Sequence, residues 1–341
     1  MQLISDQDTD TKSGVAIILA YPDTVVRTAT RELSRYLWPI LGIGGINNVK
    51  AGHAALVLVC KNKGSILYFD FGRYITSEDY GRVRSVKTDV ELSIPFKAIF
   101  KNNEIDNLNQ LLLYFESQSK NTHGTGRMLA SINSQIDYKK ALYYAQTLQN
   151  RGEVPYGAFT NGGSNCARFV CDLLEYSTTN VEVRKALSIS KIITPSPVSN
   201  LLKGKTEAVV YEVFQQQINT YTNKSVQKEH IKCLTARVSQ VLNFKGTIDP
   251  DVASFEISNG QWLSGIGSGA WFVLQSTNET SILRLQRFSS SGDLQSNTFV
   301  DISKSDFCIN QEYSILHGTT DSYLKVIQSK NIYSFETFVK C

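Results

Sequence analysis

The spacing of apolar residues predicts strands in the first part of the chain. Residues 15–20 form a short apolar run typical of a buried strand, and residues 52–60 form a longer run typical of a central strand. Residues 65–71 are rich in aromatic side chains, and the turn signal at residues 61–64 separates them from the preceding run. We therefore expect residues 52–60 and 65–71 to pair as a hairpin.

Helical periodicity marks the segments between and after these strands. Apolar residues recur at helical intervals over residues 23–41, 106–115 and 137–149, and again from Cys166 onward. Residues 81–87 alternate apolar and basic side chains, which predicts a strand with one face in water. Helices packed on an antiparallel sheet make an α+β fold, and we expect that class for this part of the chain.

The last third of the sequence has a different pattern of apolar and turn-forming residues. Short aromatic and β-branched runs separated by Gly, Ser and Asn turns predict a small all-β domain, with strands at residues 270–274, 281–285, 298–302 and 323–327. Helical-looking stretches at residues 208–217 and 225–238 precede it. The predicted division is an α+β domain over residues 1–203, a helical connector over 204–239 and an all-β barrel or sandwich over 240–341.

Composition narrows the class of protein. The 341 residues are 42% hydrophobic, which is enough for a sizeable core, and two domains are the expected number. The net charge of +4 is scattered and forms no basic stripe, so no nucleic-acid partner is implied. The first apolar run is too short to span a membrane and lacks the basic flank of a signal peptide, so we expect a cytoplasmic protein with no membrane span. A removed export signal stays open as an alternative, and the sequence does not indicate the oligomeric state.

The cysteines predict neither a metal site nor a disulfide framework. The six of them, at positions 60, 166, 171, 233, 308 and 341, follow no metal-ligand spacing. Two of the six, Cys60 and Cys171, lie in strongly apolar segments, where a small buried thiol is the ordinary occupant. We therefore expect no bound metal. The glycine-rich residues 42–45 and 265–270 lack the strand and helix context of a dinucleotide site, so no cofactor is expected either.

Cys166 has the surroundings that a reactive thiol needs. A loop rich in Gly, Pro, Asn and Ser over residues 152–165 leads directly into its helix, with Ser164 or Asn165 as the candidate N-cap. The free N–H groups and partial positive charge of a helix N-terminus favour a thiolate and can also bind an oxyanion. The alternative is a buried cysteine that begins a helix without any chemical role.

The candidate bases are few, because the chain has four histidines. His53 enters the most apolar predicted strand directly after Gly52, so its imidazole is either hydrogen-bonded in the core or exposed at a strand end that faces a cleft. His123 lies in a turn-like segment and is a reserve base or a substrate contact; the alternative for it is a solvated surface histidine.

Asp70 is the one charged residue in its predicted strand, where it lies between two phenylalanines. A buried carboxylate needs a partner, and a histidine on the paired strand would be held in one tautomer by it. The competing explanation is an ion pair with Arg73, Arg82 or Arg84. Tyr68, on the same face of the strand, is a second candidate for the orienting role.

These motifs together resemble a known family. A histidine that opens a strand (Gly52-His-Ala-Ala-Leu), a following strand with a polar residue, and Asn165-Cys-Ala-Arg-Phe-Val170 resemble the circularly permuted NlpC-type, papain-like family that includes lecithin retinol acyltransferase. With Tyr68-Phe-Asp-Phe-Gly-Arg-Tyr74, Gly81-Arg-Val-Arg-Ser85 and residues 261–272, the chain also looks like a bacterial two-domain form of this family, with an appended β domain.

The resemblance implies a role for each motif residue. Cys166 would be the nucleophile, His53 the general base and acid, and Asp70 the polar third member, with Tyr68 as its rival. The oxyanion would be held by the backbone N–H of Cys166 and a nearby side chain. The side-chain candidates for oxyanion or substrate contacts are Tyr21, Tyr68, His123 and Asn165.

The function expected from these residues is that of a thiol hydrolase, a cysteine peptidase or amidase that works through an acyl-enzyme. By family analogy its substrate is a peptide of the cell-wall type. Two alternatives stay open: an acyltransferase of the same fold, and a catalytically inactive binding protein that uses the β domain.

Overall fold

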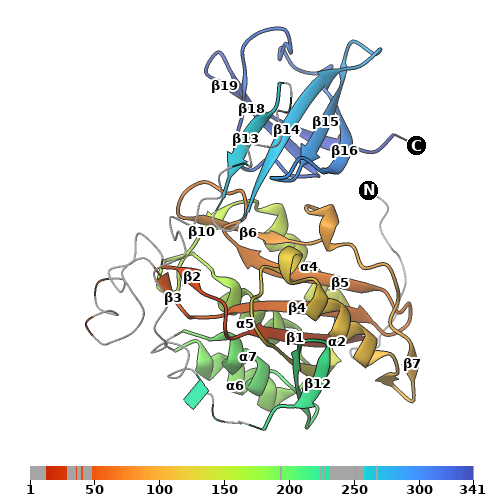
Figure 1. Cartoon of the computed structure of the whole chain (residues 1–341), viewed down its shortest axis with the longest axis vertical. Helices are drawn as coiled ribbons and strands as arrows, with labels where there is room; N and C mark the ends of the chain where they lie inside the picture. Colours follow the sequence, from red (N-terminus) through yellow and green to blue (C-terminus); the bar gives the residue numbers. More distant parts are fainter. Residues whose placement is uncertain are drawn as a thin grey trace.

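The computed structural model describes residues 13–28, 48–192, 194–222, 259–265 and 268–340, with residues 36, 40, 225, 228, 229, 250 and 257 as isolated positions. Two sheet-based units are visible in Figure 1. The first combines a large sheet with helices, and the second is all-β, so the expected α+β class followed by an all-β unit is confirmed.

An eight-stranded antiparallel sheet forms the centre of the first unit, in the order β10-β6-β5-β4-β1-β9-β11-β12. Its strands are β1 (Gly14–Tyr21), β4 (His53–Cys60), β5 (Ile66–Gly72), β6 (Tyr80–Arg84), β9 (Met128–Ile136), β10 (Val154–Pro155), β11 (Val210–Phe214) and β12 (Gln217–Thr220). The two middle strands, β1 and β4, are buried along their whole length because they are covered on both faces, which explains their unbroken apolar sequences.

Helices cover both faces of this sheet. Four helices, α4 (Tyr138–Asn150), α5 (Cys166–Ser177), α6 (Val181–Ser190) and α7 (Pro197–Lys203), pack in one cluster with alternate residues of β1, β4 and β5. The other residues of these strands pack against α2 (Leu108–Ser117), which the short helix α3 (Ser119–Thr122) follows. The sequence signal for α4 and α5 is therefore correct, as is the hairpin of β4 and β5, in which Ala55 faces Asp70.

Two short ladders and a one-turn helix complete the first unit. Strand β2 (Val26–Arg27) pairs with β3 (Asn48–Val49), and β7 (Phe100–Lys101) pairs with β8 (Glu104–Ile105). The 3-10 helix η1 (Val90–Leu92) follows β6. The predicted helix over residues 23–41 lies mostly outside the described residues. Val26–Arg27 form a strand instead, whereas the isolated described positions Tyr36 and Ile40 are helical.

Two predictions for other segments are wrong. Residues 210–214 and 217–220, expected in a helical connector, form the hairpin of β11 and β12, and Val213 of β11 is fully buried. Tertiary pairing of β11 with β9 here overrides a weak helical pattern. Residues 81–87 were expected to expose their basic face to solvent. Arg82 and Arg84 of β6 are instead buried in ion pairs.

The second unit is a seven-stranded antiparallel sheet that curls into a near-barrel, in the order β13-β14-β15-β16-β19-β18-β17. Its strands are β13 (Gln261–Ser264), β14 (Gly269–Ser276), β15 (Ile282–Phe288), β16 (Leu294–Asp301), β17 (Ser314–Ile315), β18 (Tyr323–Gln328) and β19 (Asn331–Phe338). The side chain of Gln261 bridges the two end strands: it donates to the Tyr313 carbonyl and accepts from the Ile315 N–H. We call this part of the chain the β unit.

The aromatic contacts of Phe169 predict how much α5 depends on its buried face. Phe169 is fully buried and stacks on Phe71, with ring centroids 6.3 Å apart. Because Phe→Ala leaves a cavity in addition to the lost transfer energy, Phe169→Ala should lower the free energy of unfolding by about 3–5 kcal/mol. The matched control is Tyr143→Ala on α4, which is 63% exposed and should change stability by no more than about 0.5 kcal/mol. Urea unfolding of both variants measures the difference.

Candidate active site

The candidate site lies where one end of the central strands meets the start of α5. Gly52 turns the chain into β4 with φ +77°, a conformation that favours glycine, and its N–H donates to the Thr24 carbonyl. His53 thereby becomes the first residue of β4 and pairs with Tyr21, the last residue of β1. The position of His53 at the end of its strand follows from these two contacts.

Cys166 is the first residue of α5, and Asn165 is its N-cap. The Asn165 side chain accepts a hydrogen bond from the Arg168 N–H at 2.8 Å, which satisfies one of the free amides of the first turn. The amides of Cys166 and Ala167, at the same helix end, have no partner within the helix itself. The Cys166 side chain lies at this helix end and the residue is 7% exposed. The capping prediction is thus confirmed for Asn165.

Four side chains surround the fully buried carboxylate of Asp70. Arg84 binds both of its oxygens, with Nε 3.0 Å from Oδ1 and Nη2 2.6 Å from Oδ2. The hydroxyls of Tyr68 and Tyr74 donate to Oδ2 at 3.0 and 3.3 Å. His53 completes the group, with Nε2 3.3 Å from Oδ2. The sequence left two partners open for Asp70, a histidine on the paired strand and an arginine. The Asp70 carboxylate contacts both His53 and Arg84.

This arrangement keeps Asp70 ionised. Burial on its own would raise the pKa of the Asp70 carboxyl, but the charge of Arg84 and the hydrogen bonds from His53 and Arg84 lower it far below its ordinary value. The guanidinium of Arg84 also lies 3.6 Å from the ring centroid of Tyr74 and donates to the Asn121 carbonyl. Arg84 is thus fixed on three sides, and the position of Asp70 is fixed with it.

His53 stands between Asp70 and Cys166. Burial alone would lower the pKa of His53, but hydrogen bonds with the Asp70 carboxylate and the Cys166 thiol group outweigh burial and raise this pKa to about 9. Since Nε2 is directed at Asp70, Nδ1 is the nitrogen left for the sulfur. The imidazole beside Cys166 is therefore cationic at neutral pH.

His53 and Asp70 lie on one face of the sheet, and Cys166 lies on the other. Along β4 and β5, alternate residues such as Ala55 and Tyr68 pack on the α2 side, and this alternation gives His53 and Asp70 the same side. Cys166 belongs to the cluster on the other side, around α5. His53 and Cys166 each begin their element, and a hydrogen bond joins their side chains across this end of the sheet.

The remaining predicted site residues surround this centre in different ways. Tyr21 stacks on His53 with ring centroids 6.2 Å apart, and burial raises the pKa of its hydroxyl. His123 ends α3 with φ +53° and stacks on Tyr74 at 4.9 Å. Burial and the charge of Arg84 lower the pKa of His123 to about 3, so its ring is neutral near pH 7. The oxyanion and substrate roles of Tyr21, Tyr68, His123 and Asn165 stay predictions.

Tyr74 is the neighbour that the sequence did not single out. Its hydroxyl lies 3.4 Å from His53 Nε2 as well as 3.3 Å from Asp70 Oδ2, and its side chain is almost fully buried. Neither periodicity nor composition marks this residue, because it follows the end of β5. The usable signal was its place in the Tyr68–Tyr74 segment that carried part of the family resemblance.

Comparison with known proteins agrees with a division of the chain into two parts. Residues 16–183, which include His53, Asp70 and Cys166, match the model of a family described as type VI secretion system effector TseH-like. The first unit is similar to TseH-like effectors. Residues 260–338 match a second model, the DUF6695 C-terminal domain. No curated protein matches the chain.

Among solved structures, the crystal structure of the type VI secretion system effector TseH is similar to the chain, with 16% sequence identity and a TM-score of 0.39. The match covers 61% of this chain and 98% of TseH. Within the described ranges, His, Cys, Asp and Glu side chains form no group of three or more that could hold a metal ion. None of the helices described has both the length and the apolar character needed to cross a bilayer.

The buried ion pair predicts the cost of neutralising Asp70. Asp70→Asn removes the charge that faces Arg84 and leaves a guanidinium buried without its counter-ion, so the free energy of unfolding should fall by about 3–5 kcal/mol. Asp172→Asn is the control: Asp172 pairs with the partly exposed Lys191, and its loss should cost about 0–1 kcal/mol. Equal losses in the two variants, measured by urea unfolding, would contradict this account.

The raised pKa of His53 predicts a pH dependence of stability. A group whose pKa is higher in the folded than in the unfolded chain stabilises the fold fully below its unfolded value, and this stabilisation is lost as the pH rises through the folded value. For His53 these values are 6.5 and about 9. The stability difference between wild type and His53→Gln should therefore shrink by on the order of 3 kcal/mol between pH 6 and pH 10. A constant difference across this range would show that folding does not raise the His53 pKa.

Proposed function

We propose that this protein is a thiol hydrolase that cleaves amide bonds through an acyl-enzyme on Cys166. The observation that carries the proposal is the position of His53, whose imidazole interacts with the Cys166 thiol on one side and the Asp70 carboxylate on the other. A nucleophile, a base and a group that orients the base are the parts that covalent acyl transfer needs.

Each residue has one step in the proposed reaction. The Cys166 thiolate attacks the carbonyl carbon, a C–S bond forms, and the carbonyl oxygen becomes an oxyanion beside the free amides at the start of α5. The His53 imidazolium then gives its proton to the leaving amine as the C–N bond breaks. Water, deprotonated by the now neutral His53, attacks the thioester and releases the acid and the thiolate. Asp70 stays ionised throughout and keeps the charged imidazole in place.

The substrate class that we propose is a peptide, and a bacterial cell-wall peptide in particular. Support comes from the resemblance to the permuted NlpC-type, papain-like family and from the match of residues 16–183 to the TseH-like effector family. A hydrolase that is delivered as an effector would act outside the cell that makes it, which departs from the cytoplasmic location expected from composition. The order of the elements, with the His53 strand before the Cys166 helix, agrees with a permuted arrangement.

Selective alkylation tests the nucleophile without a known substrate. We expect iodoacetamide to modify Cys166 in the folded protein near pH 7, and His53→Gln to slow this reaction by about a hundredfold, because the cation beside the sulfur is lost. The matched control is Cys171, five residues later in the same helix; it is fully buried, and burial raises its pKa to about 12, so it should not react until the protein unfolds. Peptide mass spectrometry reads each cysteine separately.

Digestion of purified cell-wall sacculi then tests the substrate class. Wild-type protein should release new amine and carboxyl ends from the peptide stems, whereas Cys166→Ala should release none while keeping the wild-type unfolding curve. Transfer of the acyl group to an added amine in place of water would indicate an acyltransferase. A Cys166 that is as inert as Cys171 would refute the enzyme and leave a binding protein as the better explanation.

A further inference from the structure

The β unit is joined to the first unit next to the candidate site and not at a remote surface. Strand β6 lies on the side of the first unit that faces the β unit (Figure 1). Between the end of β5 and the start of β6, the segment Arg73–Thr76 passes along this boundary, and its residue Tyr74 is the one whose hydroxyl reaches His53 and Asp70. Two independent sets of contacts from the β unit converge on this segment.

The first contact is apolar. Ile75, although part of the first unit in sequence, is 2% exposed and packs in the hydrophobic core of the β unit, with residues such as Leu263 and Phe272. Its φ is +50°, which is rare and strained for a β-branched residue. Because such a conformation persists only when its surroundings enforce it, the burial of Ile75 in the β unit is what holds it.

A close backbone approach reinforces this contact. Gly265 of the β unit lies so near the segment that a Cβ at this position would be 2.2 Å from the Ile75 nitrogen and 3.0 Å from the Arg73 carbonyl oxygen. Any side chain at Gly265 would therefore push the two backbones apart. The close packing of Gly265 thus restricts the backbone on both sides of Tyr74.

The second contact is electrostatic. The Arg82 Nε donates to the Tyr74 carbonyl at 2.8 Å, and the two other nitrogens of Arg82 bind the Asp89 carboxylate at 2.6 and 2.7 Å. Asp89 in turn faces Arg287 of β15, which is 4% exposed and also pairs with Glu91 and Asp321. Ion pairs therefore link Arg287 of the β unit to Arg82 through Asp89, and the hydrogen bond from Arg82 extends this network to the Tyr74 carbonyl.

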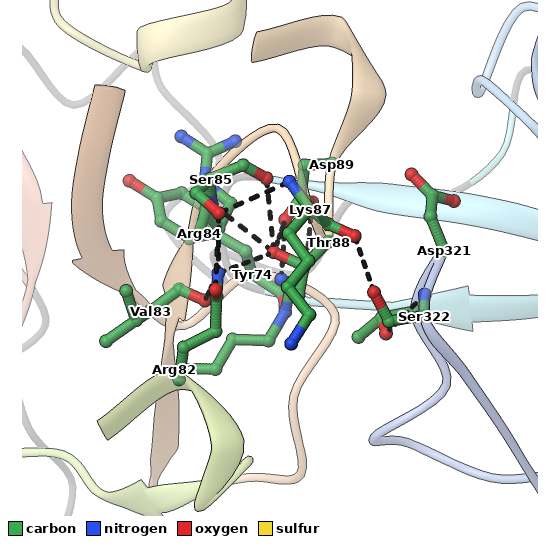
Figure 2. Close-up of polar contacts among 12 residues, drawn as sticks. Tyr74, Arg82, Val83, Arg84, Ser85, Lys87, Thr88, Asp89, Asp321 and Ser322 are labelled. Atoms are coloured by element: carbon green, nitrogen blue, oxygen red, sulfur yellow. Dashed lines mark hydrogen bonds and ion pairs between the residues drawn. The ribbon is translucent and has the colours of Figure 1, made fainter. Parts of the chain in front are cut away.

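Further hydrogen bonds hold the loop after β6 to the β unit. Figure 2 shows Ser322 beside this loop, and its hydroxyl donates to the Lys87 carbonyl at 2.6 Å. The Val90 N–H donates to Asp321 at 3.0 Å. The loop carries Asp89, so the β unit binds both the carboxylate and the backbone around it. Arg287 is buried among three carboxylates. Such a buried group of charges is stable only when its geometry is fixed, so the two units are held in a defined arrangement here.

We propose that the β unit is a positioning element for the candidate site, which holds Tyr74 against His53 and Asp70 through Ile75 on one side and through the Arg287–Asp89–Arg82 chain on the other. The proposal rests on the proposed function in treating His53 and Asp70 as the catalytic pair. Tyr74 itself acts through these two residues. The β unit thereby becomes a condition for the geometry of the site, in addition to anything that its outer surface binds.

The test measures the His53 imidazole directly by NMR of protein labelled at histidine, with His53→Gln to assign its signal among the four histidines. Wild type should titrate with a pKa of about 9. Tyr74→Phe, Ile75→Gly and Arg287→Met should each lower this pKa toward 6.5 by about one unit, since each loosens a hydrogen bond to a charged group and admits water. Glycine at position 75 keeps the left-handed backbone accessible, so only the side chain is removed.

Leu283→Ala is the matched control. Leu283 is 2% exposed in the same core. It lies near the start of β15, whereas Arg287 lies next to Phe288 at the other end of this strand. It should destabilise the β unit and leave the His53 pKa at the wild-type value. The Tyr74→Phe and Ile75→Gly shifts should also be less than additive when combined, because both act through one hydroxyl. Should a variant fail to fold, Ile75→Val and Arg287→Lys should give smaller shifts in the same direction.

Two results would overturn the proposal. In the first, Leu283→Ala lowers the His53 pKa as much as Ile75→Gly and Arg287→Met do. In the second, Tyr74→Phe leaves the His53 pKa unchanged. The alkylation rate of Cys166 is recorded on the same samples. A wild-type Cys166 that does not react refutes the hydrolase, whereas the His53 titration still decides whether the β unit positions the pair. The two failures are therefore distinguishable.

Discussion

The buried contact of Asp70 with Arg84 is the interaction on which the site depends. A carboxylate without any solvent exposure is stable only when its charge is balanced and its oxygens accept hydrogen bonds, and Arg84 supplies the charge and two of the bonds. Once Asp70 is fixed as an anion, His53 on the neighbouring strand is held by it. The hairpin of β4 and β5 sets the distance between the two, because its register places Asp70 opposite Ala55, two residues from His53.

Much of the first unit follows from its sequence. The apolar runs of β1 and β4 could be recognised because strands covered on both faces have no reason to alternate. The start of α5 was marked by its loop and cap, and Asn165 does cap the helix. The close approach of His53 to Cys166 came from a family pattern, since no local rule brings together residues so far apart in the chain.

What the sequence did not reveal has a common cause. Arg82 and Arg84 suggested a solvent-exposed face, because arginines are mostly exposed, yet both are buried in ion pairs. Arg84 pairs with Asp70 of β5, and Arg82 pairs with Asp89 in the loop after β6, which Arg287 of the β unit also contacts. Residues 210–220 looked helical, but they form a hairpin that extends the sheet beyond β9. Tyr74 is marked by neither periodicity nor composition. In each case the deciding partner belongs to another part of the fold, which periodicity cannot see.

The order of strands in the β unit has a consequence for when the site can mature. Strand β19 is the last strand along the chain, but in the sheet it lies between β16 and β18. The near-barrel therefore cannot close around its core until residues 331–338 have been synthesised. Until then Ile75 has no completed core to enter, so a nascent chain would carry His53, Asp70 and Cys166 well before the β unit could contact the segment Arg73–Thr76. The contact of Tyr74 with His53 would therefore be completed only late in translation.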